Sequence, residues 1–296
     1  MGIIAIVISV FATFSAIITL AINFGLLYQI FISKKLKKSN SLTFFYLRFF
    51  IDGLMSADGL VIVVFFSFRL SNIETIFDTY PVIVFYINWP SAILLSIRSV
   101  LVVIITLDRT IAIFLPLLYH NKRRNFSLLI IVLLLMGYIC MENYILWVVC
   151  EFVVYVPPGC INMWCFMNQC FIDFFLKSEL ISHAIIVLLS LVLAIKLLVW
   201  NRLPASSSEF LTRANRLVLI DAFIIIVFDV FPAALMTKIY TGKFEDIGPV
   251  IMLSKMSGYA LEGYLVICAL KRIDKNNKAS NVKSISTVKV KPSRIG

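Results

Sequence analysis

An acidic residue and an arginine stand side by side at positions 108 and 109, where a long apolar run gives way to basic residues. A guanidinium buried at the mouth of a helix bundle is costly unless a carboxylate compensates it. Asp108 can therefore hold Arg109 in a resting state and release it to a partner protein when the bundle opens. Pro116 and Tyr119 follow closely. The simpler alternative is an arginine that suits the macrodipole at a helix C-terminus.

Ionisable side chains inside the apolar runs form a second group of candidates. Each is expensive in hydrocarbon and tends to face the interior of a bundle. Arg98 lies roughly three helical turns before Asp108, at a depth that Asp52 can share, so we expect Arg98 and Asp52 to pair. Such a pair either only fixes helix packing or belongs to a ligand or ion site, in which a small acidic ligand could compete for Arg98. The candidates for this crevice are Asp52, Asp58, Arg98, Asp229, Lys255 and Glu262.

Two positions near the end of the chain carry more specific expectations. Lys255 is expected to pair with Glu262, two turns farther along the same segment, or to snorkel toward the membrane surface. Phe231 and Pro232 form an aromatic-proline step. Because proline lacks a backbone donor and can kink a helix, Pro232 is a predicted hinge.

Four of the six cysteines share one long connection: Cys150, Cys160, Cys165 and Cys170. An oxidising exterior permits disulfides, so one or two bridges within this connection are expected. Free buried thiols that behave as small apolar side chains are the alternative. A zinc site would need closer cysteine pairs or histidines, and His183 is the only nearby histidine, so no metal is predicted.

The composition identifies the elements that must position these residues. With 61% hydrophobic residues, 15% charged residues and a mean hydropathy of +0.98, the chain exceeds what one soluble core can hide. Several runs reach the roughly 20 residues that cross a bilayer as helix, and backbone groups in lipid must be satisfied within the segment. We therefore predict an all-α integral membrane bundle of seven transmembrane helices over residues 3–32, 42–68, 82–107, 127–149, 180–200, 217–237 and 249–270.

Lysine and arginine set the expected orientation, because they collect in cytoplasmic loops. Nineteen of the 27 basic residues lie in alternate connections and in the tail, whereas the other connections hold four: Arg69, Lys177, Lys238 and Lys243. The N-terminus is predicted outside and the C-terminus inside. Residues 1–270 would form the receptor domain, and residues 271–296 a disordered basic tail facing an anionic leaflet. The net charge of +11 then needs no nucleic-acid partner.

In this setting the stretch "LDRTIAIFLPLLYH" at residues 107–120 resembles the rhodopsin-like G-protein-coupled receptors. In that family an acid-arginine pair closes the third helix and is followed by alanine, isoleucine, proline and tyrosine at this spacing. The resemblance implies that the partner of Arg109 is the C-terminal helix of a heterotrimeric G protein α subunit. Pro116 and Tyr119 would then shape the second cytoplasmic loop, and a small-molecule ligand would occupy a crevice between the helices.

The chain also departs from the rhodopsin-like pattern. The last segment lacks Asn-Pro-x-x-Tyr, and no cysteine stands near Val84, so the cysteine-rich loop cannot be tied to the third helix in the usual way. With these departures, the chain is similar to the nematode serpentine chemoreceptors, most closely class bc. The resemblance is carried by three stretches: "RSVLVVIITLDRTIAIFLPLLYH", "PPGCINMWCFMNQCF" and "LIDAFIIIVFDVFP". This resemblance implies a plasma-membrane receptor of sensory neurons, on cilia in some cases, for a pheromone or an environmental chemical.

Other functional classes fit less well. Catalytic motifs such as His-Glu-x-x-His, Gly-x-Ser-x-Gly and the P-loop are missing from the sequence, so neither an enzyme nor a cofactor is predicted. A transporter or a ligand-gated channel that uses the intramembrane charges as a conduction path is the alternative to a receptor. Uptake or current without any G protein would favour that alternative.

Overall fold

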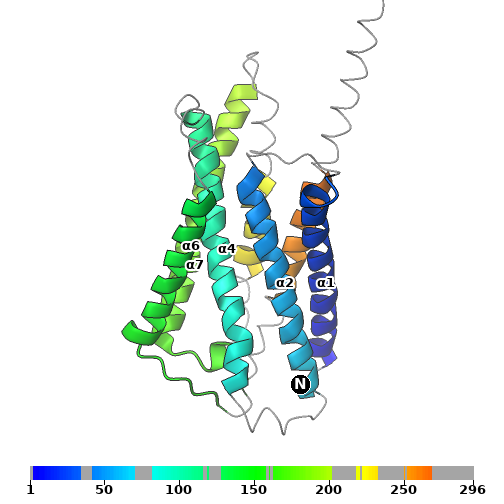
Figure 1. Cartoon of the computed structure of the whole chain (residues 1–296), viewed down its shortest axis with the longest axis vertical. Helices are drawn as coiled ribbons and strands as arrows, with labels where there is room; N and C mark the ends of the chain where they lie inside the picture. The colour runs from blue at the N-terminus through cyan, green and yellow to red at the C-terminus, as the bar shows by residue number, and fades with distance from the viewer. Residues whose placement is uncertain are drawn as a thin grey trace, which may run out of the picture.

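The computed structural model describes residues 3–34, 42–70, 82–115, 119, 128–157, 160, 163–201, 218–220, 222–232, 250 and 252–268. These residues form one bundle of helices that run along a common direction (Figure 1). No strand occurs within these ranges. Pro116, the predicted loop position, and the predicted tail at residues 271–296 lie outside them.

Long helices make up most of the bundle. In chain order the elements are α1 (Ile3–Phe31), α2 (Thr43–Leu70), α4 (Val82–Phe114), α6 (Leu128–Tyr144) with the π-turn η2 (Ile145–Val149), the 3-10 turn η3 (Met163–Cys165), α7 (Gln169–Asn201) and the π-turn η4 (Ile225–Val230). The π-turn η4 lies within helical residues 222–232, and a last helix covers residues 252–268.

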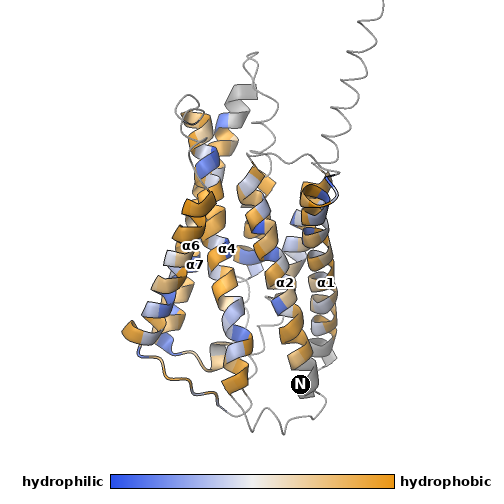
Figure 2. Cartoon of the chain, viewed as in Figure 1, coloured by the Kyte–Doolittle hydropathy of each residue, from blue (hydrophilic) through white to orange (hydrophobic). Residues whose placement is uncertain are grey.

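Four of the described helices are long and apolar enough to cross a membrane: Val7–Phe31, Val82–Phe114, Leu128–Val149 and Gln169–Lys196. Apolar ribbons cover most of the bundle, and hydrophilic stretches interrupt them at mid-height (Figure 2). The chain is therefore a multi-pass membrane protein whose polar groups gather between the helices.

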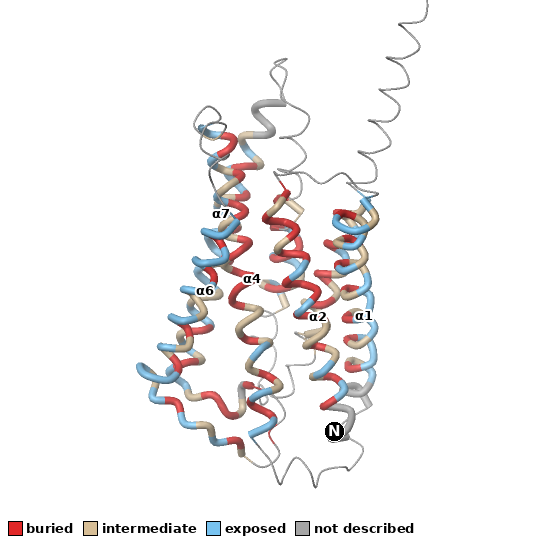
Figure 3. Tube along the Cα trace, in the orientation of Figure 1, coloured by how far each residue is buried: buried red, intermediate tan, exposed pale blue. Residues whose placement is uncertain are grey.

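The helix α4 lies at the centre of the described bundle. Half of its most apolar stretch is buried, compared with 17% of the corresponding stretches of α6 and α7. Figure 3 shows this difference as buried segments along α2 and α4 and exposed segments along the outer sides of α1, α6 and α7. Leu101 and Ile105 of α4 are fully buried in the main hydrophobic core. The exposed apolar side chains of the outer helices fit a lipid environment.

Hydroxyl side chains on the helices donate hydrogen bonds to backbone carbonyls, mostly to those of their own helix. Thr106 donates to the carbonyl of Val102 at 2.8 Å, and Ser56 donates to that of Asp52 at 2.7 Å. This i to i−4 bonding lets small polar side chains sit in an apolar helix without an unpaired hydroxyl. Thr19 of α1 also donates to the carbonyl of Met256 at 3.0 Å, which joins α1 to the helix at 252–268.

Two helices extend beyond the predicted segments by more than a few residues. The helix α4 continues past the expected end at Leu107 to Phe114, because a charged pair near a helix end does not stop the helix. The helix α7 begins at Gln169, eleven residues before the predicted segment. Its first turn is capped by the Asn168 side chain, which accepts a hydrogen bond from the Phe171 backbone N–H at 3.1 Å. This capping residue precedes the apolar run, so the apolar run alone places the start of the helix too late.

Candidate functional site

Four charged side chains meet between α2, α4 and the helix at 252–268. We call Arg48, Asp52, Arg98 and Glu262 the central ionic cluster. Arg98 Nε donates to Asp52 Oδ1 at 2.7 Å, and Arg98 Nη2 donates to Glu262 Oε2 at 3.1 Å. Arg48 pairs with Asp52 at 3.4 Å and also contacts Glu262. The Arg98 guanidinium carbon lies 3.8 Å from the centre of the Tyr259 ring.

The central ionic cluster is almost fully buried, since its four side chains are only 1–4% exposed. Two guanidinium groups face two carboxylates, so the cluster is neutral as a whole. Removing one member of such a buried set leaves an uncompensated charge and costs roughly 3–5 kcal/mol. The cluster therefore ties α2, α4 and the helix at 252–268 together, and an acidic ligand would meet an Arg98 guanidinium that already binds two carboxylates.

The predicted pairing of Arg98 with Asp52 is present, but the sequence analysis missed Arg48. Arg48 stands near the start of its segment, where a basic residue is easily assigned to the membrane interface. Its spacing of four residues from Asp52 places both side chains on one helix face, and this signal could have identified it.

The expectation that Lys255 pairs with Glu262 is wrong. Lys255 Nζ instead donates to Glu179 Oε1 of α7 at 2.8 Å. Glu262 is occupied by Arg48 and Arg98, so it offers Lys255 no free carboxylate. Glu179 stands just before the predicted segment at 180–200, yet it lies within α7 because that helix begins early.

The predicted hinge lies next to a buried acid. Pro232 follows the π-turn η4, and it cannot donate to the carbonyl four residues earlier, that of Phe228. Ser254, from the helix at 252–268, donates to this carbonyl at 2.8 Å in its place. Asp229 is the next residue, is 5% exposed, and its Oδ1 has no hydrogen-bond partner in the part of the chain that the structure describes. A π-turn of this kind often marks a functional position in a helix.

A small polar cavity opens between α4, α6 and α7. Its volume is ≈ 10 Å³, about the space of one water molecule. The polar residues that line it are Ser96, Ser99, Tyr138, Ser178, Glu179 and Ser182. Ser96 also donates to Glu142 Oε1 at 2.6 Å, which ties α4 to α6. Asp58 lies apart from this cavity, half-buried in α2 beside Ser91.

At the far end of α4, the Asp108 and Arg109 side chains pair at 3.1 Å. Arg109 is 1% exposed and its guanidinium carbon lies 5.9 Å from the centre of the Phe45 ring, whereas Asp108 is 15% exposed. The Tyr119 hydroxyl donates to Asp108 Oδ2 at 3.1 Å. Asp108 Oδ2 thus contacts both Arg109 and Tyr119. No three histidine, cysteine or acidic side chains gather as metal ligands in the described ranges.

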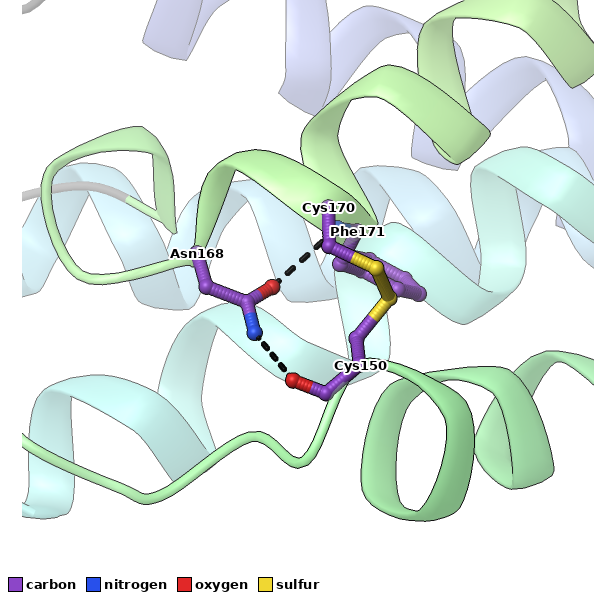
Figure 4. Close-up of a disulfide and its surroundings, with 4 residues drawn as sticks. All are labelled: Cys150, Asn168, Cys170 and Phe171. Carbon is purple, nitrogen blue, oxygen red and sulfur yellow. Dashed lines mark hydrogen bonds between the residues drawn. A yellow bond between two sulfur atoms is a disulfide. The ribbon is translucent and has the colours of Figure 1, made fainter.

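The cysteine-rich loop between α6 and α7 contains two disulfides, Cys150–Cys170 and Cys160–Cys165. Their Cα atoms are 5.6 and 5.8 Å apart, within the usual range for a disulfide. Asn168 reinforces the first bridge by donating to the Cys150 carbonyl at 2.7 Å (Figure 4). The two bridges join the four cysteines that the sequence analysis names as candidates. The loop is thereby closed on the start of α7.

Aromatic packing joins this loop to α4, which has no cysteine at the expected position. Phe85 lies 5.9 Å from both Phe152 and Phe166, measured between ring centres. Trp89, one turn along α4, packs against Phe171 at 5.6 Å. We refer to these five rings as the aromatic cluster. It replaces a covalent link between the loop and the third helix with buried hydrophobic surface.

Phe85→Ala is expected to destabilise the protein by about 3–5 kcal/mol, since Phe85 is 3% exposed and contacts several rings. The measurement is the thermal midpoint of the purified protein, supported by its surface yield in cells. Tyr86→Ala is the matched control, because Tyr86 is adjacent in sequence but 69% exposed. Equal losses in the two variants would show that the aromatic cluster does not hold the loop.

A family model described as the serpentine type 7TM GPCR chemoreceptor Srbc matches residues 1–274. No curated protein matches the chain. The match covers nearly the whole sequence, including the helices that carry the central ionic cluster and the Asp108–Arg109 pair.

Proposed function

We propose that this chain, which belongs to the Srbc family of serpentine seven-transmembrane chemoreceptors, binds a small molecule within its helix bundle and thereby activates a heterotrimeric G protein. The family match over residues 1–274 is the observation that carries the proposal. The family is a class of membrane receptors rather than of enzymes. The ligand would be a pheromone or an environmental chemical, and the receptor would act in the plasma membrane of sensory neurons, including their cilia.

The Asp108–Arg109 pair supports coupling to a G protein. A buried arginine held by a partly exposed acid can be released when that acid changes partner or the bundle opens. The hydrogen bond from Tyr119 to Asp108 links this release to the segment that follows α4. Pro116 would shape the same segment. A G protein that contacts this segment could therefore break the ion pair between Asp108 and Arg109. Its own hydrogen-bond acceptors would then bind the Arg109 guanidinium.

The mutual pairing of the intramembrane charges favours a receptor over a transporter or a channel. Arg48 and Arg98 are each shared between the same two carboxylates, on helices far apart in sequence. Such a closed set stabilises helix packing, whereas a conduction path needs charged groups that can exchange with passing ions. Ligand-gated current without a G protein would contradict this preference.

The experiment that tests the proposal is a G-protein dissociation assay on the full-length chain in cells, screened against a library of small metabolites. At least one compound is expected to cause dissociation in cells that express the chain and in no cells that lack it. A response that persists when the α subunits are deleted would refute the coupling.

The receptor orientation can be tested separately. An epitope at Met1 should bind antibody on intact cells, and an epitope at Gly296 only after permeabilisation, because the basic connections remain in the cytoplasm. Asn125 begins the sequon Asn125-Phe126-Ser127, which the same orientation places inside, so it should carry no glycan. Glycosylation at Asn125 would contradict the proposed orientation, because it would place this residue outside the cytoplasm.

A further inference from the structure

The Lys255–Glu179 pair is more accessible than the central ionic cluster. Its side chains are 13% and 18% exposed, against 1–4% for the members of the cluster. Lys255 also precedes Glu262 by seven residues, so it lies about 10 Å closer to the end of the bundle that the disulfide loop covers. Among the ion pairs that join described helices, this pair is therefore the one that a ligand entering from the loop end reaches first.

Asp229 offers Lys255 a second carboxylate. The hydrogen bond from Ser254 to the carbonyl of Phe228 holds the residues just before Lys255 and Asp229 together. Gly258 allows this approach, because a Cβ there would lie 2.8 Å from that of Phe228. Lys255 and Asp229 interact electrostatically, yet Lys255 forms its ion pair with Glu179, and Asp229 Oδ1 accepts no hydrogen bond from the described residues.

The charges of this region are not balanced. With His183 counted as neutral, three cationic side chains among the described residues, Arg48, Arg98 and Lys255, face four carboxylates, and the additional acid is Asp229. A buried carboxylate without a cation is costly, so one further positive charge would stabilise the region. An anionic ligand would increase the imbalance. A cationic ligand would remove it, provided that Lys255 can move to Asp229.

The surroundings of Glu179 suit such a ligand. Glu179 lines the small polar cavity together with the hydroxyl groups of Ser99, Ser178 and Ser182. These hydroxyls can accept hydrogen bonds from an ammonium group and can also bind a polar substituent beside it. The cavity itself holds only about one water molecule, so the ammonium position must come from displacement of Lys255.

The geometry points to a binding site for a small protonated amine at Glu179, where the amine replaces the ammonium of Lys255 and Lys255 moves to the carboxylate of Asp229. This inference rests on the proposed function, since it names the ligand class of the receptor. The exchange breaks the contact between α7 and the helix at 252–268 and strengthens the contact of that helix with η4. Pro232 follows η4, so the exchange acts directly on the predicted hinge.

The experiment measures the thermal midpoint of the purified full-length protein with n-butylammonium chloride, sodium butanoate or n-butanol. At about pH 8 imidazole is neutral, so His183 does not supply the missing charge. Butylammonium should raise the midpoint of the wild type by about 2–4 °C, and the other two compounds should not. Glu179→Gln should abolish the rise. Asp173→Asn, which changes an exposed acid on the same helix, should retain it.

Two further variants test the exchange itself. Asp229→Asn should raise the amine concentration for half-maximal stabilisation about tenfold, because displaced Lys255 loses its second carboxylate. Lys255→Ala should bind butylammonium more tightly than the wild type, because no ammonium has to leave. Stabilisation by butanoate instead, or no stabilisation by the amine in either the wild type or Lys255→Ala, would overturn the site.

The readout involves no G protein, so the two proposals can fail separately. Amine binding that depends on Glu179, in a receptor that activates no G protein, would refute the coupling and keep the site. G-protein activation by compounds that carry no amine, together with an unchanged midpoint in butylammonium, would keep the receptor and refute the site.

Discussion

Arg109→Ala is expected to abolish agonist-driven G-protein activation while leaving ligand binding and surface expression largely intact. The guanidinium lies at the end of α4, about 16 Å from the depth of Arg98, and its described contacts are with Asp108 and the Phe45 ring. If the proposed coupling is right, its loss removes a group that the G protein would need and leaves the ligand crevice unchanged. The measurement is G-protein dissociation with the agonist found in the screen, alongside surface labelling of the same cells.

Variants of the residues that hold Arg109 should act in the opposite direction. Asp108→Asn should raise basal signalling, because it weakens the ion pair that restrains the guanidinium. Tyr119→Phe removes only a hydrogen bond to Asp108 and should raise basal signalling less. Normal agonist-driven signalling in Arg109→Ala would remove the main support for coupling through this residue.

Arg98→Leu is expected to remove most of the protein from the cell surface. The variant leaves Arg48 facing the two buried carboxylates of Asp52 and Glu262, with one negative charge uncompensated. The cost is about 3–5 kcal/mol, a large part of the stability of a typical domain. The measurement is surface yield and the thermal midpoint of the purified protein.

Double variants distinguish a lost charge balance from a lost shape. Arg98→Leu with Asp52→Leu leaves Arg48 paired with Glu262, so surface yield should recover. Arg98→Leu with Glu262→Leu leaves Arg48 paired with Asp52 and should recover similarly. Arg98→Leu with Glu142→Leu is the control, because Glu142 bonds to Ser96 outside the cluster, and it should not recover. Additive losses in all three doubles would show that Arg98 acts by packing alone.

Rescue of folding does not imply rescue of signalling. If the Arg98–Asp52 pair only holds the helices, the rescued double variant should answer the agonist as the wild type does. If the pair also transmits ligand binding from Lys255 and Glu179 toward Arg109, the same variant should reach the surface and bind, yet fail to activate the G protein. Both results come from one set of cells.

The sequence by itself determined the class of the protein and the local features of its helices. Apolar runs long enough to cross a bilayer can only satisfy their backbones as helices, so the all-α membrane bundle follows from composition and length. The stretch at 107–120 identified the receptor class because its residues are neighbours along one chain segment. One or two bridges within the disulfide loop were predictable because its four cysteines share one connection, but their pairing was not.

Only the tertiary structure decided which charges pair. Arg98 and Asp52 could be matched by depth, but depth does not reveal how a helix is rotated, and rotation decides which of several acids a cation faces. Lys255 therefore pairs with Glu179 across the bundle rather than with Glu262 on its own helix. Arg48 enters the central ionic cluster for the same reason. Asp229 Oδ1 has no hydrogen-bond partner among the described residues. Hydrophobic runs carry no information on these contacts, because a long-range ion pair depends on the packing of helices that the local sequence does not specify.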